Sequence, residues 1–435
     1  MTVEAEVPSN PSDNVVEVVS RLIRFDTTNT GELETTQGEA ECAHWVAQQL
    51  AEVGYQPEYL ESGAPGRGNV FARIQGADSS RGALLIHGHL DVVPAEPAEW
   101  SVHPFSGAIE HGYVWGRGAV DMKDMVGMMI VVARQLKQAG IVPPRDLVFA
   151  FVADEEHGGH YGAQWLVDNR PDLFDGVTEA IGEVGGFSLT VPRRDGGERR
   201  LYLIETAEKG LSWMRLTARG VAGHGSMVHE QNAVTAVAEA VARLGRHRFP
   251  LVPTDTVAQF LAAIGEETGL PLDPESADLE GVIEKLGPMA RMLKAGYKAN
   301  VIPATAEAAV DCRILPGRRA AFEAEVDELI GPDVTREWIR DLPSYETSFD
   351  GDLVDAMNAA VLALDPDART VPYMLSGGTD AKAFARLGIR CFGFSPLRLP
   401  PELDFASLFH GVDERVPTDA LRFGTEVLAH FLTHC

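Results

Sequence analysis

Short apolar segments alternate with helical patterns along the first half of the chain, and polar residues lie in or directly after each apolar segment. The three clearest strand segments are 84–93, 147–153 and 180–184. Helical patterns lie around them at 14–24, 38–53 and 122–138. This alternation predicts an α/β sheet with helices on its faces. Buried acids and imidazoles are costly unless they are paired or bind metal, and ligands bind beyond the carboxyl ends of strands in open α/β sheets.

The pattern changes between about residues 205 and 341. Strand patterns occur there at 213–218, 308–315 and 335–340, and helical patterns at 232–244 and 318–330. They predict a small sheet with helices on one side, with an excursion rich in Pro, Gly and acids at 250–297. We therefore expect a discontinuous domain, residues 1–204 and 342–435, with a mixed central sheet flanked by helices. A smaller α+β domain, residues 205–341, is inserted into it, and a chain of 435 residues is long enough for two cores.

Charge and targeting signals exclude several classes of protein. A net charge of -27 argues against nucleic acid or an anionic membrane as a partner. The acidic start, MTVEAEVPSN, does not resemble a signal peptide, and the apolar run 125–133 is too short to span a bilayer. Four cysteines without CxxC spacing are typical of reduced thiols. We expect a soluble cytoplasmic enzyme.

The first chemical motif is His87-Gly88-His89-Leu90-Asp91. Residues two apart in a strand point to the same side, so His89 and Asp91 face together. An Asp in this position can accept the other ring N–H of a metal-bound His and fix its tautomer. A hydrogen-bonded strand end without metal explains the motif equally well.

The second motif is WGRGAVDMKD, residues 115–124. Its two glycines allow a tight turn before a helix, and Asp121 could bridge two cations. Asp124 fits a helix start, where the helix dipole favours an acid. The motif lacks the third glycine of a dinucleotide-binding loop, so we reject that interpretation.

The third motif is ADEEHGG, residues 153–159. Adjacent glutamates after a strand suit a division of labour in which Glu156 binds metal and Glu155 transfers protons. A solvated acidic loop is the alternative, but the pair follows the apolar segment 148–152. Glu183 and His410 are uninformative alone and matter only as members of a set.

Two imidazoles and three carboxylates form that set: His89, Asp121, Glu156, Glu183 and His410. Such ligands favour a pair of zinc ions, with cobalt or manganese as substitutes. The chain contains no H-E-x-x-H, P-loop or G-x-S-x-G motif.

With these motifs in order, the sequence resembles the co-catalytic zinc metallopeptidases and amidohydrolases. This family includes carboxypeptidase G, aminoacylase, acetylornithine deacetylase, succinyl-diaminopimelate desuccinylase, carnosinase-type dipeptidases and peptidase T. The resemblance covers nearly the whole chain. Its most specific stretches are HGHLDVVPA, WGRGAVDMKD, ADEEHGG and RGVAGHGSMVH.

The resemblance implies two zinc ions per subunit. His89 and Glu183 match terminal ligands of one ion, Glu156 and His410 match ligands of the other, and Asp121 matches the bridge.

Two further catalytic roles follow from the same resemblance. Asp91 matches the residue that orients the ligand His, and Glu155 matches the general base. Members of the family tend to have a cis bond at the position of Asp121-Met122.

The resemblance also assigns roles in the inserted domain, which matches a lid that usually forms the dimer interface. His224 matches a His that reaches the partner's active site and stabilises the oxyanion. Arg313 and Asn300 match residues that hold the substrate's carboxylate and carbonyl, although a strand-surface ion pair and a turn are the alternatives. Gly377 and Gly378 match a loop that lines the substrate pocket.

The function implied is hydrolysis of amide bonds, peptide or N-acyl, in small substrates with a free carboxylate, by a homodimer. The motifs do not distinguish a peptidase from an N-acyl-amino-acid deacylase. A metal-stabilised binding or scaffold protein of the same fold is the rival. It predicts loss of the base or the bridge, yet Glu155 and Asp121 are both present.

Overall fold

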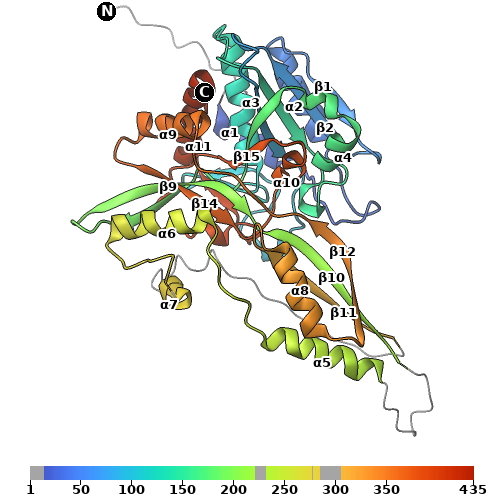
Figure 1. Cartoon of the computed structure of the whole chain (residues 1–435). Coiled ribbons are helices and arrows are strands. Elements are labelled where there is room, and N and C mark those ends of the chain that lie inside the picture. Colours follow the sequence, from blue (N-terminus) through green and yellow to red (C-terminus); the bar gives the residue numbers. More distant parts are fainter. Residues whose placement is uncertain (1–13, 221–231, 277, 285–304) are drawn as a thin grey trace, which may run out of the picture. The chain divides into compact units, whose positions relative to one another are not determined.

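The computed structural model describes residues 14–220, 232–276, 278–284 and 305–435. The chain divides into two compact units (Figure 1). The first comprises residues 1–206, 349–373 and 379–435, and the second comprises residues 207–348 and 374–378. The role of the inserted segment as a lid and dimerisation domain stays a prediction.

A mixed sheet forms the centre of the first unit. Its strands are β1 (Glu58–Glu61), β2 (Gly68–Ile74), β3 (Ala83–His89), β6 (Leu147–Val152), β7 (Val177–Gly182), β8 (Ser188–Pro192), β9 (Glu198–Glu208), β14 (Arg369–Leu375) and β15 (Arg390–Gly393). The order is β1-β2-β6-β3-β7-β15-β9, and β8 and β14 also pair with β9. The pairs β3–β6, β3–β7 and β7–β15 are parallel, and the pairs β1–β2, β2–β6 and β8–β9 are antiparallel.

Helices cover both faces of this sheet. They are α1 (Val15–Ile23), α2 (Ala40–Glu52), α3 (Lys123–Gln138), α4 (Ala163–Asn169), α9 (Asp352–Leu364), α10 (Ala381–Ala385) and α11 (Thr418–His434). Gly88 of β3 faces α3, since a Cβ there would meet Met122, Val126 and Met129. The ring of the preceding residue, His87, contacts that of Phe384 in α10, so α3 and α10 lie on opposite faces.

The main core lies on the α3 side. Helices α1, α2 and α11 pack against α3, and their apolar faces join the sheet in one cluster of buried residues. Every residue of β3 and β6 is buried, because helices cover both faces, and β6 is therefore apolar throughout, whereas β3 is apolar up to His87.

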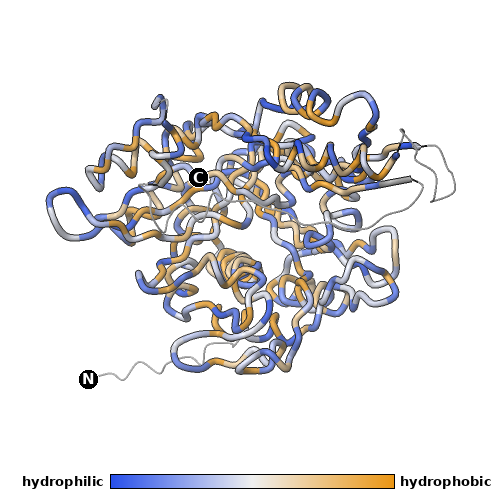
Figure 2. The backbone as a smooth tube through the Cα atoms, turned by 90° about the horizontal axis from the view of Figure 1, so that it is seen from below, coloured by the Kyte–Doolittle hydropathy of each residue, from blue (hydrophilic) through white to orange (hydrophobic). Residues whose placement is uncertain are grey.

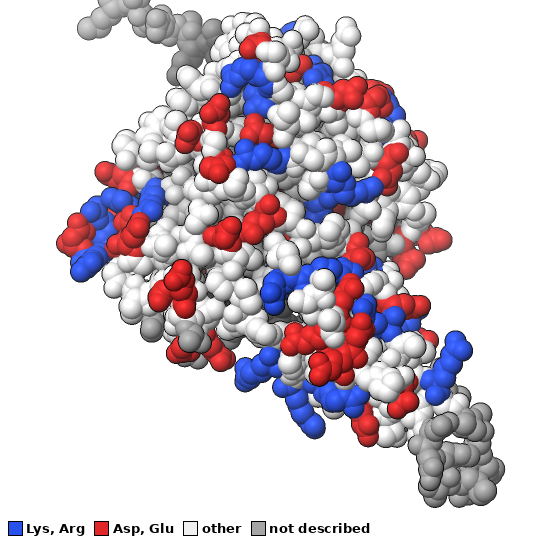
Figure 3. Space-filling model, viewed as in Figure 1, with Lys and Arg blue, Asp and Glu red and all other residues white. Residues whose placement is uncertain are grey.

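A small sheet of β4 (Ala108–Glu110), β5 (Tyr113–Trp115) and β16 (Arg415–Pro417) completes the first unit. The turn between β8 and β9 is hydrophilic (Figure 2). Acidic and basic side chains are interspersed over the face seen in Figure 3. The four cysteines are free, as predicted, and all four are buried.

The second unit contains a three-stranded antiparallel sheet in the order β11-β10-β12. Its strands are β10 (Gly210–Arg219), β11 (Thr305–Ile314) and β12 (Val334–Leu342), and a short β13 (Tyr345–Glu346) pairs with the end of β9. Its helices are α5 (Ala233–Arg246), α6 (Asp255–Thr268), α7 (Leu279–Glu284) and α8 (Arg319–Ile330). Helices α5 and α8 pack together over the core of this sheet. The predicted α/β class, with a mixed sheet and a smaller α+β part, is confirmed. None of the described helices combines the length and apolar character needed to cross a bilayer.

Candidate metal centre

The five predicted metal ligands come from the carboxyl ends of parallel strands and from two loops. His89 is the last residue of β3, Glu156 lies in a 3-10 turn after β6, and Glu183 follows β7. Because these three strands are parallel neighbours, their carboxyl ends meet at one edge of the sheet. Asp121 precedes α3, and His410 lies on the loop before β16.

Asp121 lies between the two imidazoles. Its Oδ1 is 3.0 Å from His89 Nε2, and its Oδ2 is 3.1 Å from His410 Nε2. Glu183 Oε2 is 3.5 Å from the same His89 nitrogen, and Glu156 Oε2 is 3.0 Å from that of His410. The structure thus brings all five residues together in two subgroups that share Asp121. Their roles as ligands stay predictions.

The centre is buried on one side and open on the other. His89, Asp121 and Glu183 are 1%, 8% and 6% exposed, whereas the side chain of His410 is 53% exposed. A small molecule could therefore approach from the side of His410.

The charges of the centre shift the pKa values of its groups strongly. Burial opposes charge on His89, but the Glu183 and Asp121 carboxylates outweigh it and hold the pKa of His89 well above its ordinary value. Hydrogen bonds to Asp121 and Glu156 raise the pKa of His410 to about 10. Burial raises the pKa of Glu183 to about 7.

The donor set fits divalent metal ions. Burial, followed by the Asp121 carboxylate, raises the pKa of Glu156, so negative charge is in excess here. Glu156 Oε1 is buried and has no hydrogen-bond partner among the described residues. Ligand atoms of His89, Asp121 and Glu156 lie within 4.8 Å of one another, as do those of His89, Glu155 and Glu183. Imidazole and carboxylate ligands at this spacing suit zinc and related ions.

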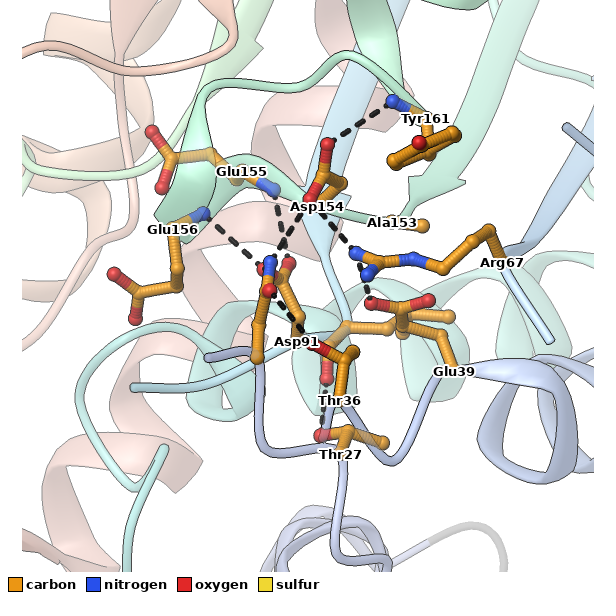
Figure 4. Close-up of polar contacts among 12 residues, drawn as sticks. Thr27, Thr36, Glu39, Arg67, Asp91, Ala153, Asp154, Glu155, Glu156 and Tyr161 are labelled. Carbon is orange, nitrogen blue, oxygen red and sulfur yellow. Dashed lines mark hydrogen bonds and ion pairs between the residues drawn. The ribbon is translucent and has the colours of Figure 1, made fainter. Parts of the chain in front are cut away.

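Asp91 contacts both the imidazole of His89 and the loop that carries Glu155 and Glu156. His89 Nδ1 lies 2.9 Å from the backbone oxygen of Asp91 and 3.5 Å from its Oδ1. The carboxylate also accepts the backbone N–H groups of Glu155 and Glu156 at 3.0 and 3.2 Å (Figure 4). Asp91 therefore holds the loop of the two glutamates as well as facing the imidazole.

Glu414 is a residue of the site that the sequence motifs did not indicate. It is fully buried, and its carboxylate accepts the N–H groups of Gly118, Val120 and Asp121 at 3.1, 2.8 and 3.3 Å. It also accepts from Arg117 Nη1 at 2.7 Å. Glu414 thereby fixes the backbone on which Asp121 is placed. It belongs to none of the motifs described above, so no local signal marks it.

Arg313, Gly377 and Gly378 belong to the second unit. The Arg313 guanidinium forms two bonds of 2.9 Å with Asp311 and donates to a backbone oxygen at 3.3 Å. His224 and Asn300 lie outside the described residues. The Asp121–Met122 peptide bond is cis, as predicted.

Comparison with known proteins supports the resemblance inferred from the motifs. Residues 85–434 match the model of peptidase family M20/M25/M40. The chain is 27% identical to the N-fatty-acyl-amino acid synthase/hydrolase PM20D1 of Xenopus tropicalis, over 98% of this chain and 86% of that protein. It is also 27% identical to aminoacylase-1 of Sus scrofa, over 82% of this chain and 81% of that protein.

A solved structure shares the fold. The M20 family metallo-carboxypeptidase Sso-CP2 of Sulfolobus solfataricus superposes with a TM-score of 0.67 at 18% identity, covering 97% of this chain and 98% of that one. The family model covers most of the chain, and the fold and the gathered acids and imidazoles agree with it. The chain therefore belongs to peptidase family M20/M25/M40, a family of metal-dependent hydrolases.

Proposed function

We propose that this protein is a dinuclear metal amidohydrolase, with zinc as the preferred metal. His89 and Glu183 would hold one ion, Glu156 and His410 the other, and Asp121 would bridge them. The observation that carries the proposal is the position of Asp121, which directs one carboxylate oxygen toward each imidazole. A carboxylate held between two imidazoles, each beside its own glutamate, is what a shared bridge requires.

Glu155 is the general base in this proposal. Two divalent ions at the site would lower the pKa of a bound water toward about 7 and polarise the substrate's carbonyl. Burial and the nearby Glu183 carboxylate raise the pKa of Glu155 well above its ordinary value, so this side chain is a stronger base than an exposed glutamate. Glu155 takes a proton from the attacking water and returns it to the leaving nitrogen.

We propose N-acyl amino acids as the main substrate class. The similarity to an aminoacylase and to an N-fatty-acyl-amino acid hydrolase supports this choice. Small peptides are the second candidate, because the family model is that of a peptidase. Arg313 and Asn300 would bind the carboxylate and carbonyl region, and Gly377 and Gly378 would line the pocket. His224 would act across a homodimer formed by the inserted domain.

The test is a panel of N-acyl amino acids and dipeptides, assayed with the zinc-loaded protein and with Glu155→Gln. Removing the proton-carrying carboxylate should lower kcat by roughly 10²- to 10⁴-fold. Bound zinc, measured by elemental analysis, should stay near the wild-type level. Unchanged turnover in the variant would refute the role of Glu155. Absence of metal-dependent hydrolysis across the panel would favour the binding or scaffold alternative.

A further inference from the structure

A buried row of charged side chains lies behind the loop that carries Glu155 and Glu156 (Figure 4). Glu39, Arg67 and Asp154 are 0%, 2% and 3% exposed. A single nitrogen, Arg67 Nη2, donates to Asp154 Oδ1 at 2.8 Å and pairs with Glu39 Oε1 at 2.9 Å. Buried charges are costly unless they are paired, and here two acids share one guanidinium, while burial raises the pKa of Glu39 to about 8.

Asp154 determines how the loop leaves β6. Its backbone is left-handed, with φ of 68°, which few residues other than Gly, Asn and Asp adopt. Both carboxylate oxygens are used: Oδ1 accepts from Arg67 and from Asn29 Nδ2, and Oδ2 accepts from the N–H of Tyr161. The 3-10 turn Glu155–His157 begins at the next residue. The side chain of Asp154 therefore fixes the start of the turn that carries both glutamates.

Asn29 connects this row to the metal centre. Its Nδ2 donates to Asp154 Oδ1 and to Asp91 Oδ2, both at 2.9 Å. Asp91 in turn accepts the N–H groups of Glu155 and Glu156. The loop is thus held from two sides, by Asp91 at its backbone N–H groups and by Arg67 through Asp154.

We propose that Arg67, supported by Glu39, is a positioning residue for Glu155 and Glu156. It touches neither glutamate and acts through Asp154. Without its guanidinium, the carboxylates of Glu39 and Asp154 would lose the cation they share, and the left-handed start of the turn would lose a bond. The inference rests on the proposed function, in which Glu155 moves a proton and Glu156 binds metal.

The experiment compares Arg67→Met with Arg145→Met. Arg145 is a matched control because it is also buried, at 5% exposure, and pairs with Glu179 at 2.6 Å. It lies before the first residue of β6, whereas the loop of interest follows the last. Three quantities are measured: kcat and KM on an N-acetyl amino acid, zinc affinity of the metal-free protein, and the midpoint of urea unfolding.

Arg67→Met should lower kcat and zinc affinity by about 10- to 100-fold each, as loss of a residue that orients metal ligands typically does. KM should change by less than about threefold, since the substrate contacts remain. Arg145→Met should lower the unfolding midpoint but leave kcat and zinc affinity unchanged. Arg67→Lys should restore part of the loss, because one nitrogen makes both contacts of the guanidinium.

Unchanged zinc affinity and kcat in Arg67→Met, or equal losses in Arg145→Met, would overturn the proposal. Should Arg67→Met fail to fold, Asp154→Asn provides the second variant, because Asn tolerates the left-handed backbone but carries no charge. It should shift zinc affinity in the same direction, and no shift would again overturn the proposal. If the wild type hydrolyses nothing, the proposed function fails, while zinc affinity still tests the positioning of Glu156.

Discussion

Replacing Asp91 by Asn should destabilise the metal-free protein measurably. The two oxygens of Asp91 accept three hydrogen bonds: a buried one from Asn29 Nδ2 and two partly buried ones from the N–H groups of Glu155 and Glu156. Asn offers one oxygen and one NH2 group, so in either orientation at least one donor meets another donor. A buried donor left without an acceptor costs about 1–3 kcal/mol, and the remaining bonds lose the roughly 1 kcal/mol that a charged acceptor adds. The total is about 3 kcal/mol.

Urea unfolding of the metal-free protein measures this loss. With a slope of about 3 kcal/mol per molar urea, the midpoint should fall by roughly 1 M. Zinc affinity and kcat should fall as well, because the same bonds hold Glu155 and Glu156. Asp146→Asn is a suitable control: Asp146 accepts a backbone N–H at 2.9 Å before β6, outside the centre, so only stability should change. A shift below about 0.5 kcal/mol in Asp91→Asn, with normal kcat, would refute the reasoning.

Three further predictions concern packing and pH. Gly182→Ala should destabilise the first unit by about 1–3 kcal/mol in thermal unfolding, because its Cβ would lie 2.3 Å from the buried ring of His87; an unchanged Tm would contradict this. Burial opposes the charge of Asp365, but the Arg200 guanidinium outweighs it and lowers the Asp365 pKa below its ordinary 3.8. The stability that this pair contributes is therefore present above pH 3.8 and is lost as the pH falls through the pKa of Asp365 in the folded protein. In Asp365→Asn, the free energy of unfolding should therefore fall less steeply as the pH is lowered below 3.8. A fall as steep as in the wild type would argue against a contribution from this pair. Hydrogen bonds raise the pKa of His410 to about 10 in the metal-free protein, so zinc must displace its proton on binding. Apparent zinc affinity should therefore rise by up to about tenfold for each pH unit below that value. Calorimetry in buffers of different ionisation enthalpy counts the released proton, and release of no proton at pH 7 would contradict the assignment.

The central strands and the main helices could be predicted because their patterns are strong. The apolar run predicted at 147–153 corresponds to β6, Leu147–Val152, and the helical pattern at 122–138 corresponds to α3, Lys123–Gln138. The three strands of the small sheet in the first unit, β4, β5 and β16, could not be predicted, since each has three residues and shows no periodicity. Strand β9 was also missed, because its first residues are charged and only its later ones are buried.

The candidate site was predictable to the extent that its residues follow strands. His89, Glu156 and Glu183 lie at or after strand ends, where convergence follows from the parallel order of the strands. His410 was included only as a member of the set, because its loop has no pattern of its own, and its pairing with Glu156 came from the family resemblance. Arg67 and Glu414 were missed for a different reason. A buried charge is stabilised by its ion-pair partner, and here each partner lies far away in the sequence. Arg67 pairs with Asp154, and Glu414 pairs with Arg117.

The first unit is assembled from both ends of the chain, and this order has a consequence for synthesis on the ribosome. His410 and Glu414 lie within the last 26 residues, as does all of α11, which packs on α3. Until that final stretch leaves the exit tunnel, the emerging protein presents an acidic cluster lacking one of its two imidazoles and an apolar helix surface without its cover. At about 5–20 residues per second, the earlier part of the chain waits many seconds in this state. Nascent chains of this protein should therefore need shielding by chaperones until residues 410–434 have emerged, and metal loading should follow their emergence.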